Sequence, residues 1–421
     1  MKRSSKGITD DVRMRGFGER QSVEAALAWL DGELRLLEAE PIALHRAAGR
    51  VLASDVVGEL DVPGFDRSMM DGYALVASTL DGASPDQRVL LTVIGDSFPG
   101  RPFEGSVAIG QAVRIMTGAP LPIGCDAVLP AESVEDPPPP PSASGRTVYA
   151  VAHVPSGKHV GRRGEDVAHG SRLFEAGRRL RPQDLGVLSS VGIRDVQVVR
   201  QPRVRLVVTG NELVPSGSRP HGYRLVDANG PMLTALVERD GGIVDFPGLV
   251  PDTDDAILGA LRADADVVIV SGGTSVGMED LVPMLLAAHG ELAVHGIAMR
   301  PGGPTGFGRL DHRLVFLLPG FPVSCLCAYD FFAGRAIRAL GGRSKAWPYS
   351  SIRATLTRPL TSPPGRLDYA RVRVIGGRVE PLAITGASVL TSTTRADGFV
   401  IIPTDSEGFD GGTEVDVWLY S

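Results

Sequence analysis

The chain has few cysteines, no long apolar run and no long basic run, and each of these absences excludes a class of protein. Its three cysteines, Cys125, Cys325 and Cys327, are too few and too badly spaced for a disulfide framework or a zinc site, so a reducing cytoplasm is expected. No segment approaches the ~20 apolar residues that a membrane-spanning helix needs. A net charge of −6 without a long basic run gives no indication of a nucleic-acid surface, so small molecules or proteins are the expected partners.

Glycine and proline, in contrast, are abundant, with 52 and 32 residues. They imply many turns and short elements, as in sheets and barrels, and a chain of 421 residues is expected to form two to four domains. We expect residues 1–20 to be disordered, because they are charged and no apolar segment follows them. Pro137–Pro141 predicts a stiff protruding linker, with a ligand for a proline-binding module as the alternative.

One loop has the composition of an anion-binding site. Val267–Val270 predicts a strand buried on both faces, and Gly272 and Gly273 break it in a loop whose backbone N–H groups remain accessible. A helix is expected after Asp280, which stands near its N-cap. Strand, glycine loop and helix start together are typical of a phosphate or oxyanion cradle. The alternative is a glycine turn kept for steric reasons, because the loop matches neither the P-loop nor the dinucleotide fingerprint.

Strands and helices alternate around that loop, which predicts a parallel, doubly wound α/β domain. Ligands bind beyond the carboxyl ends of the strands in such sheets, and here these ends carry TGNEL, SGGTSVG and LPGFPVS. The expected strands are 204–208, 243–246, 267–270 and 314–318, and the expected helices are 231–237, 254–261, 281–290 and 323–340. We expect Asn229 or Gly230 to cap the helix at 231–237, and Gly241-Gly242 to stop it.

The segments before and after this domain have other patterns. Apolar stripes predict a helix after Ser22, which is placed to cap it, and a second packing helix at 183–190. Short strands predict a small β domain over 89–94, 111–116, 126–130 and 147–154, and a C-terminal barrel or sandwich over 352–356, 369–375, 378–381 and 415–420. Gly376-Gly377 predicts a tight hairpin within the C-terminal set.

Two loops of the β domain carry polar side chains. RIMTGAPLP predicts a rigid exposed loop with the hydroxyl of Thr117 at its tip. DVPGFDRSMMDGYAL carries Asp61, Asp66 and Asp71. We favour a hairpin whose aspartates bond their own backbone, over a site made by the carboxylates.

The order of the motifs is more specific than any one of them. DVPGFDRSMMDGYAL, RIMTGAPLPIGCDAV, GEDV, TGNELV, DANGPML, SGGTSVGMED, RPGGPTGFG, LPGFPVS and RADGFVIIP together resemble the molybdopterin molybdotransferase family, to which the C-terminal half of gephyrin also belongs. The resemblance implies an enzyme that takes adenylylated molybdopterin and molybdate, cleaves the pyrophosphate and places the metal on the dithiolene. It also implies an elongated homodimer, whose site forms between the α/β domain of one subunit and the β domain of the other. A further possible partner is the molybdopterin adenylyltransferase, which the α/β domain resembles.

The implied fold is multidomain α/β plus β, with a C-terminal β-barrel. The implied divisions are a helical dimerisation region at 21–57 plus 162–200, a β domain at 58–161, an α/β domain at 201–343 and the barrel at 344–421.

Family motifs also carry roles over to single residues. The catalytic residues implied are Asp71, Thr117, Glu212 and Asp280, and the carboxylates among them are implied ligands of Mg²⁺. The substrate-binding residues implied are Ser271, Gly272, Gly273, Ser275, Arg300, Pro301, Gly302 and Ser324.

The chain departs from the family pattern at several of these motifs. Gly296, Arg300 and Gly303 stand where the family usually has three lysines, so one cation is left for a dianion such as molybdate. Phe321 replaces an asparagine, Asn211 replaces an aspartate, and Thr305 stands where an apolar residue is common. These changes favour keeping a second hypothesis, a divergent paralogue that acts on another substrate or serves as a dimeric scaffold.

Overall fold

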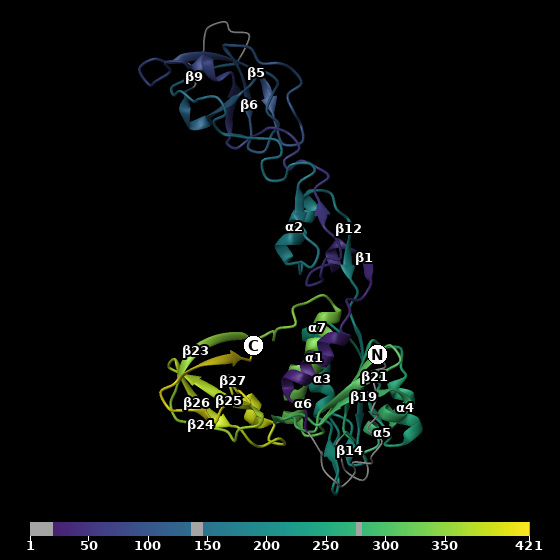
Figure 1. Cartoon of the computed structure of the whole chain (residues 1–421). Coiled ribbons are helices and arrows are strands. Elements are labelled where there is room, and N and C mark those ends of the chain that lie inside the picture. The colour runs from purple at the N-terminus through teal and green to yellow at the C-terminus, as the bar shows by residue number, and fades with distance from the viewer. Residues whose placement is uncertain (1–19, 136–145, 275–279, 421) are drawn as a thin grey trace, which may run out of the picture. The chain divides into compact units, whose positions relative to one another are not determined.

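A computed structural model describes residues 20–135, 146–274 and 280–420 of the chain, which form two compact units (Figure 1). The first unit contains the described residues up to Glu40 and from Val199 onward, and the second contains Pro41–Val198. Residues 1–19 of the segment expected to be disordered, and the proline run Pro137–Pro141, lie outside the described residues. In the described part of the chain no helix is both long enough and apolar enough to span a bilayer.

A mostly parallel sheet forms the centre of the first unit, as the alternating pattern predicts. Its strand order is β16-β13-β18-β22-β21-β19, and β17 pairs with β13. The three central strands are parallel neighbours in register, with Val208 opposite Ser271 and Ser271 opposite Leu318. Their carboxyl ends therefore meet at one edge of the sheet. The bounds are β13 Arg203–Thr209, β16 Ile243–Asp245, β17 Leu249–Val250, β18 Val267–Ser271, β19 Glu291–His295, β21 Gly306–Leu310 and β22 Arg313–Leu318.

Apolar cores cover both faces of this sheet, because successive side chains along a strand point to opposite faces. On β18, Val267 and Ile269 pack into one core, and Val268 and Val270 into another. The first core includes residues of α3 and α7, and the second includes residues of α4 and α5. The helices are α3 Asn229–Asp240, α4 Asp254–Leu261, α5 Val282–His289, α6 Pro322–Ala328, the π-helical turn η4 Tyr329–Ala333 and α7 Gly334–Leu340.

Two details of these helices differ from the expectation, and one agrees with it. The N-cap position of α3 is Ala228, not Asn229 or Gly230, whereas the stop at Gly241 is confirmed by its left-handed φ of 95°. The N-cap position of α5 is Leu281, so Asp280 stands next to the N-cap as expected. The helix expected at 323–340 contains a π-helical turn, which periodicity alone does not reveal.

A buried charge cluster lies where α3 and this π-helical turn meet. The carboxylates of Asp240 and Asp330, at most 1 % exposed, both accept from the Arg239 guanidinium, at 3.0 and 3.2 Å. Arg338 reaches Asp240 at 2.9 Å, and the Tyr349 hydroxyl donates to Asp330 at 3.0 Å. Burial raises the pKa of Asp330 to about 6, although Arg239 opposes the shift. Asp240 and Asp330 are therefore each paired with an arginine.

The first helix belongs to the first unit rather than to a separate helical region. Helix α1, Val23–Glu33, begins at Ser22, whose hydroxyl accepts from the N–H of Ala25 at 3.1 Å. Its apolar face packs Val23, Ala26 and Leu30 into the same core as Val204 of β13. This core covers the apolar stripe of α1, and the expectation that α1 shares a dimer region with the helix near 183–190 stays a prediction.

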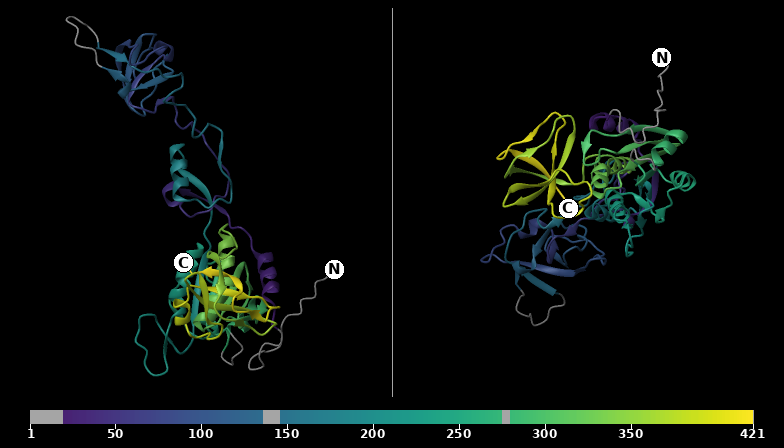
Figure 2. Two further views of the ribbon diagram at one scale, coloured as in Figure 1. Left: turned by 90° about the vertical axis from the view of Figure 1, so that its left-hand side faces the viewer. Right: turned by 90° about the horizontal axis from the view of Figure 1, so that it is seen from below.

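The C-terminal segment forms a closed barrel beside the α/β part of the same unit (Figure 2). The strand order is β20-β25-β26-β23-β29-β27, and β25 also pairs with β27, which closes the ring. The expected hairpin at Gly376-Gly377 joins β25 to β26. The bounds are β20 Met299–Arg300, β23 Ser350–Leu356, β24 Leu360–Thr361, β25 Leu367–Ile375, β26 Arg378–Ala383, α8 Thr391–Thr394, β27 Gly398–Ile402, β28 Gly408–Phe409 and β29 Glu414–Leu419.

The second unit is built on a six-stranded sheet of order β7-β4-β6-β5-β9-β8. Four of its strands, β5, β6, β7 and β9, were expected from the sequence. The bounds in and around this unit are β1 Ala39–Ala43, η1 Leu44–Arg46, β2 Val56–Val57, β3 Arg67–Ser68, β4 Gly72–Leu75, η2 Ala77–Leu80, β5 Val89–Ser97, β6 Gln111–Ile115, β7 Ala127–Pro130, η3 Ala131–Ser133, β8 Val134–Glu135, β9 Arg146–Ala150, β10 Val160–Gly161, β11 Arg172–Phe174, α2 Pro182–Ser190 and β12 Asp195–Val199.

Candidate functional site

A cavity of about 690 Å³ lies at the edge where β13, β18 and β22 end. Both its position and its volume are typical of ligand sites in α/β sheets. The loops after all three strands contribute to its wall, as the sequence predicts. The lining residues are Val208, Thr209, Gly210, Glu212, Leu213, Leu225, Val226, Asp227, Ala228, Asn229, Asp252, Ser271, Gly272, Gly273, Thr274, Asp280, Pro304, Pro319, Gly320, Phe321, Pro322 and Ser388.

The loop after β18 passes so close to β13 that one position requires glycine. Gly272 has a φ of 99°, and a Cβ on it would lie 2.0 Å from the backbone oxygen of Thr209. The steric role of this glycine is therefore established by the geometry, and the same lack of a side chain exposes the backbone to the cavity. Gly273 follows with a φ of 60°. Ser275, a predicted substrate contact, lies outside the described residues, as does Gly277.

Asn229 ties the strand-end loops together. Its side-chain nitrogen donates to the Ser271 hydroxyl and to the backbone oxygen of Gly320, both at 2.8 Å. Its Oδ1 is buried and has no hydrogen-bond partner in the described chain, and the residue is 7 % exposed. A buried acceptor without a partner on a cavity wall is suited to accept a hydrogen bond from a ligand.

Carboxylates dominate the charge of the cavity wall. Glu212, Asp227, Asp252 and Asp280 line it, and no lysine or arginine does so in the described chain. Asp227 is 5 % exposed and accepts from the N–H of Gly230 at 2.9 Å. The described residues form no group of three or more His, Cys, Asp or Glu side chains close enough to hold a metal by themselves.

Four predicted substrate contacts lie away from this wall, and their roles stay predictions. Arg300 belongs to β20, and its Nε donates at 3.1 Å to the buried carboxylate of Asp368 in the barrel. Arg300, the one cation left in its motif, is thus held in a salt bridge, and its contact with an anion stays a prediction. Pro301, Gly302 and Ser324 are buried and do not line the cavity.

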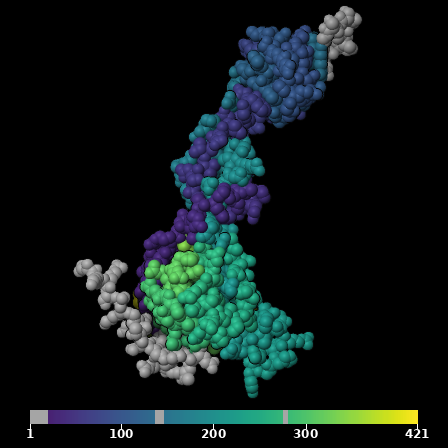
Figure 3. Space-filling view, turned by 90° about the vertical axis from the view of Figure 1, so that its right-hand side faces the viewer, coloured from purple at the N-terminus to yellow at the C-terminus, as the bar shows by residue number. Residues whose placement is uncertain are grey.

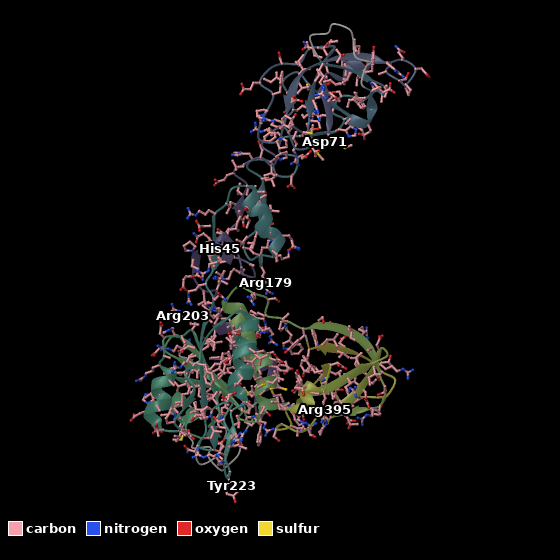
Figure 4. All side chains as sticks on the ribbon, turned by 180° about the vertical axis from the view of Figure 1, so that it is seen from behind. His45, Asp71, Arg179, Arg203, Tyr223 and Arg395 are labelled. Carbon is pink, nitrogen blue, oxygen red and sulfur yellow. The ribbon has the colours of Figure 1, made fainter. Side chains whose placement is uncertain are left out.

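Asp71 and Thr117 form a pair in the second unit, where Figure 4 labels the aspartate. One Asp71 oxygen accepts from both the N–H and the hydroxyl of Thr117, each at 2.7 Å. These two hydrogen bonds hold the pKa of Asp71 below its usual value. The pair is exposed to solvent.

The favoured hairpin for this stretch is wrong. Strand β3 pairs with β10, and β4 pairs with β6 and β7. The aspartates also bond distant segments, since Asp61 accepts from the N–H of His169 and Asp66 from that of Arg163, both at 2.8 Å. The stretch is a junction between loops far apart in sequence, which local turn chemistry cannot predict.

Several cavity residues were not singled out from the sequence. Asp227 and Asn229 stand in the DANGPML motif, whose place after a strand could have marked them. Asp252 and Ser388 carried no local signal. Arg371 was not singled out either; it does not line the cavity, but it is 0 % exposed and its Nε and Nη1 have no partner in the described chain. Its Nη2 donates to the backbone oxygen of Thr385, three residues before Ser388.

Comparison with known proteins covers nearly the whole chain. Family models match for the MoeA N-terminal region (domain I and II) over residues 21–192, a probable molybdopterin binding domain over 205–339 and the MoeA C-terminal region (domain IV) over 353–420. Molybdopterin molybdenumtransferase 2 of Mycobacterium tuberculosis is 33% identical over 96% of this chain and 99% of its own. Molybdopterin molybdenumtransferase of Haemophilus influenzae is 33% identical over 90% of this chain and 93% of its own.

Solved structures give the same result. The molybdopterin biosynthesis MoeA protein of Pyrococcus horikoshii aligns with a TM-score of 0.78 at 30% identity, covering 96% of this chain and 100% of that one. With three matched family models in order along the chain and relatives 33% identical over most of it, the chain belongs to the MoeA family of molybdopterin molybdenumtransferases.

Proposed function

We propose that the protein is a molybdopterin molybdenumtransferase, which hydrolyses adenylylated molybdopterin to release AMP and inserts molybdate into the freed molybdopterin. One observation carries the proposal: the cavity at the strand ends, walled by carboxylates and by the glycine loop, lies in a chain that aligns over 96% of its length with a relative of that name. The loop at Gly272 and Gly273 offers backbone donors to phosphate oxygens.

Magnesium fits this wall as an ion shared with the substrate. Mg²⁺ is usually held by one or two carboxylates together with substrate phosphates, rather than by a cage of protein ligands. The described residues form no such cage, and Glu212 and Asp280 line the cavity as half-exposed or exposed carboxylates. We assign these two residues to the ion, which would neutralise charge on the pyrophosphate as its bond breaks.

We also infer a role near the anion for Arg371, a buried cation that does not itself line the cavity. A buried guanidinium with two unpartnered nitrogens is costly until an acceptor arrives. The backbone oxygen of Thr385 accepts from its third nitrogen, and the segment from Thr385 leads to Ser388 in the cavity wall. Through this segment Arg371 would sense an anion bound in the cavity.

Asp71 and Thr117 are proposed to act in the same reaction, within a homodimer. The shared hydrogen bonds favour the ionised form of the Asp71 carboxylate, which suits it to hold a cation. Asp71→Asn should abolish turnover while the melting temperature changes little, because the pair is exposed. Loss of stability with normal activity per folded molecule would contradict this role.

The decisive experiment is reconstitution with purified protein, adenylylated molybdopterin, Mg²⁺ and molybdate. We expect AMP release and molybdate-dependent activation of a molybdenum enzyme. A second candidate function, action of the same fold on a less anionic substrate, is favoured by the absence of lysine and arginine from the described cavity wall. Absence of AMP release and of enzyme activation, with and without molybdate, would support that second function.

A further inference from the structure

A ten-residue arm, Pro215–Arg224, joins two short paired strands, β14 Leu213–Val214 and β15 Leu225–Val226. In Figure 3 it is the teal projection that stands out from the first unit. Every residue of the arm is exposed. The backbone hydrogen bonds within it are two local turns, from Ser218 to Pro215 at 3.1 Å and from Arg224 to His221 at 3.3 Å. The arm is thus fixed at its base and has few contacts that oppose its movement.

The base of the arm is part of the cavity wall. Leu213, Leu225 and Val226 all line the cavity. The N–H of Leu225 donates to the backbone oxygen of Glu212 at 2.8 Å, and the N–H of Asp227 donates to that of Val214 at 2.9 Å. Glu212 and Asp227 are themselves lining residues, so the chain enters and leaves the arm directly from the acidic wall.

The chemistry of the arm is the opposite of that wall. It contains Arg219, His221 and Arg224 and has no Asp or Glu. Tyr223 is 102% exposed and lies at the far end of the arm in Figure 4. No hydrogen bond, ion pair or ring contact holds these four side chains to any other described residue. The arm therefore carries two arginines and an exposed aromatic ring next to an acidic cavity, and no contact shown here gives these side chains a role in stabilising the fold.

We propose that this arm closes over the occupied cavity and binds the adenylate end of the substrate. Arg219 and Arg224 then bind phosphate oxygens, and Tyr223 stacks on the purine. The inference rests on the proposed function, because adenylylated molybdopterin supplies both the phosphates and the base. Closure of the arm would explain how the cavity binds a multiply charged anion although no described lysine or arginine lines its wall.

The positions of the side chains divide these roles. Arg224 directly precedes Leu225 of the wall in sequence and does not itself line the cavity. Arg219 and Tyr223 reach the ligand when the arm folds inward. Gly217 and Gly222, with φ of 81° and 61°, are the points where its backbone departs from ordinary extended geometry.

The first test is affinity for adenylylated molybdopterin without molybdate, so that no metal is inserted. Arg219→Ala/Arg224→Ala should raise the Kd about tenfold or more and flatten its dependence on salt. Arg373→Ala/Arg378→Ala is the matched control, because it removes two exposed arginines from the barrel and should leave the Kd unchanged. Tyr223→Ala should raise the Kd several-fold, and Tyr223→Phe should restore it, because stacking does not need the hydroxyl.

The second test reads the position of the arm without any activity. Trypsin should cut the free protein at Arg224, whereas the bond after Arg219 precedes Pro220 and resists. Saturating adenylylated molybdopterin should slow the cut at Arg224 about tenfold or more, and it should not slow cleavage at Arg378 in the barrel hairpin.

These outcomes separate the two proposals. If the wild type neither binds adenylylated molybdopterin nor releases AMP, the proposed function fails. If the wild type binds it, but the arm variants bind equally well and the ligand does not slow the cut at Arg224, the arm proposal alone is overturned. Loss of binding to the adenylyltransferase by arm variants whose ligand affinity is unchanged would also overturn it and assign the arm to a protein partner.

Discussion

The first unit holds two groups of carboxylates that differ in what surrounds them. In the buried charge cluster, Asp240 and Asp330 each meet an arginine within 3.2 Å, and water does not reach them. In the cavity, four carboxylates line one wall that no described lysine or arginine shares. Ionised acids are tolerated inside a protein when they are paired, and acids on a cavity wall can bind a cation that arrives with the ligand. We call Asp240, Asp330 and their arginines the paired group, whose carboxylates face protein on all sides, and the four lining carboxylates the cavity acids, which face a ligand.

The largest expected effect comes from breaking the paired group. Asp240→Ala leaves Arg338 and Arg239 buried with less compensation, so the free energy of unfolding should fall by about 3–5 kcal/mol. Glu238→Ala, on the exposed side of the same helix, is the control and should cost little. Tryptophan fluorescence in urea measures this directly, since Trp29, Trp347 and Trp418 all lie in the first unit. A loss below ~1 kcal/mol would show that the cluster contributes little to stability.

The second effect concerns the cavity acids and should appear in catalysis instead. Glu212→Gln and Asp280→Asn should each lower the rate of AMP release about 100-fold or more, because each removes a proposed ligand of the bridging ion. Their unfolding transitions should stay within about 0.5 kcal/mol of the wild type. Raising the Mg²⁺ concentration should recover part of the lost rate. If either variant loses as much stability as Asp240→Ala, that acid stabilises the fold, as Asp240 does.

The third effect is the pH dependence of the paired group. The folded-state pKa of Asp330, about 6, exceeds its ordinary value of 3.8, so the native state holds a proton that the unfolded state has released between these pH values. This group's contribution to stability therefore falls as pH rises from 4 to 6, and it is constant above 7. Asp330→Asn lacks this loss, so its stability relative to the wild type should rise over the same interval. A flat difference in urea titrations from pH 4 to pH 7 would rule out this assignment.

The smallest effect comes from adding a cation to the acidic wall. Gly303 adjoins Pro304 of the cavity, and the nearest atom to a Cβ placed there is the Met299 backbone oxygen at 3.3 Å. Gly303→Lys should lower the molybdate concentration for half-maximal rate about three- to tenfold. Gly296→Lys is the contrasting variant, because a φ of 89° makes any side chain there costly by about 1 kcal/mol. If Gly303→Lys leaves the molybdate concentration for half-maximal rate unchanged, this loop does not lie near the bound anion.

The strand-end site was predictable because periodicity and strand order are local signals. Val267–Val270 and the glycines after it indicate a buried parallel strand and a ligand loop, and the structure places both at the cavity. Arg300 shows the limit of that reasoning, since its partner Asp368 is 68 residues away, on a strand that pairs with β20 only in the assembled barrel. The same holds for Asp71, whose bond to Thr117 spans 46 residues. Pairings across such separations depend on the assembled fold.

The short strand β20 has a consequence for how the chain can be divided. Met299–Arg300 lies within the sequence of the α/β part, yet it pairs in parallel with β25 of the barrel. Asp368 on β25 also receives Arg300 and the Ser362 hydroxyl. A shortened chain that ends after Leu340, between the residues matched by one family model and those matched by the next, would leave an unpaired strand and an arginine without its acid. The α/β part and the barrel therefore share a strand, and separating them by truncation at that linker should destabilise both pieces.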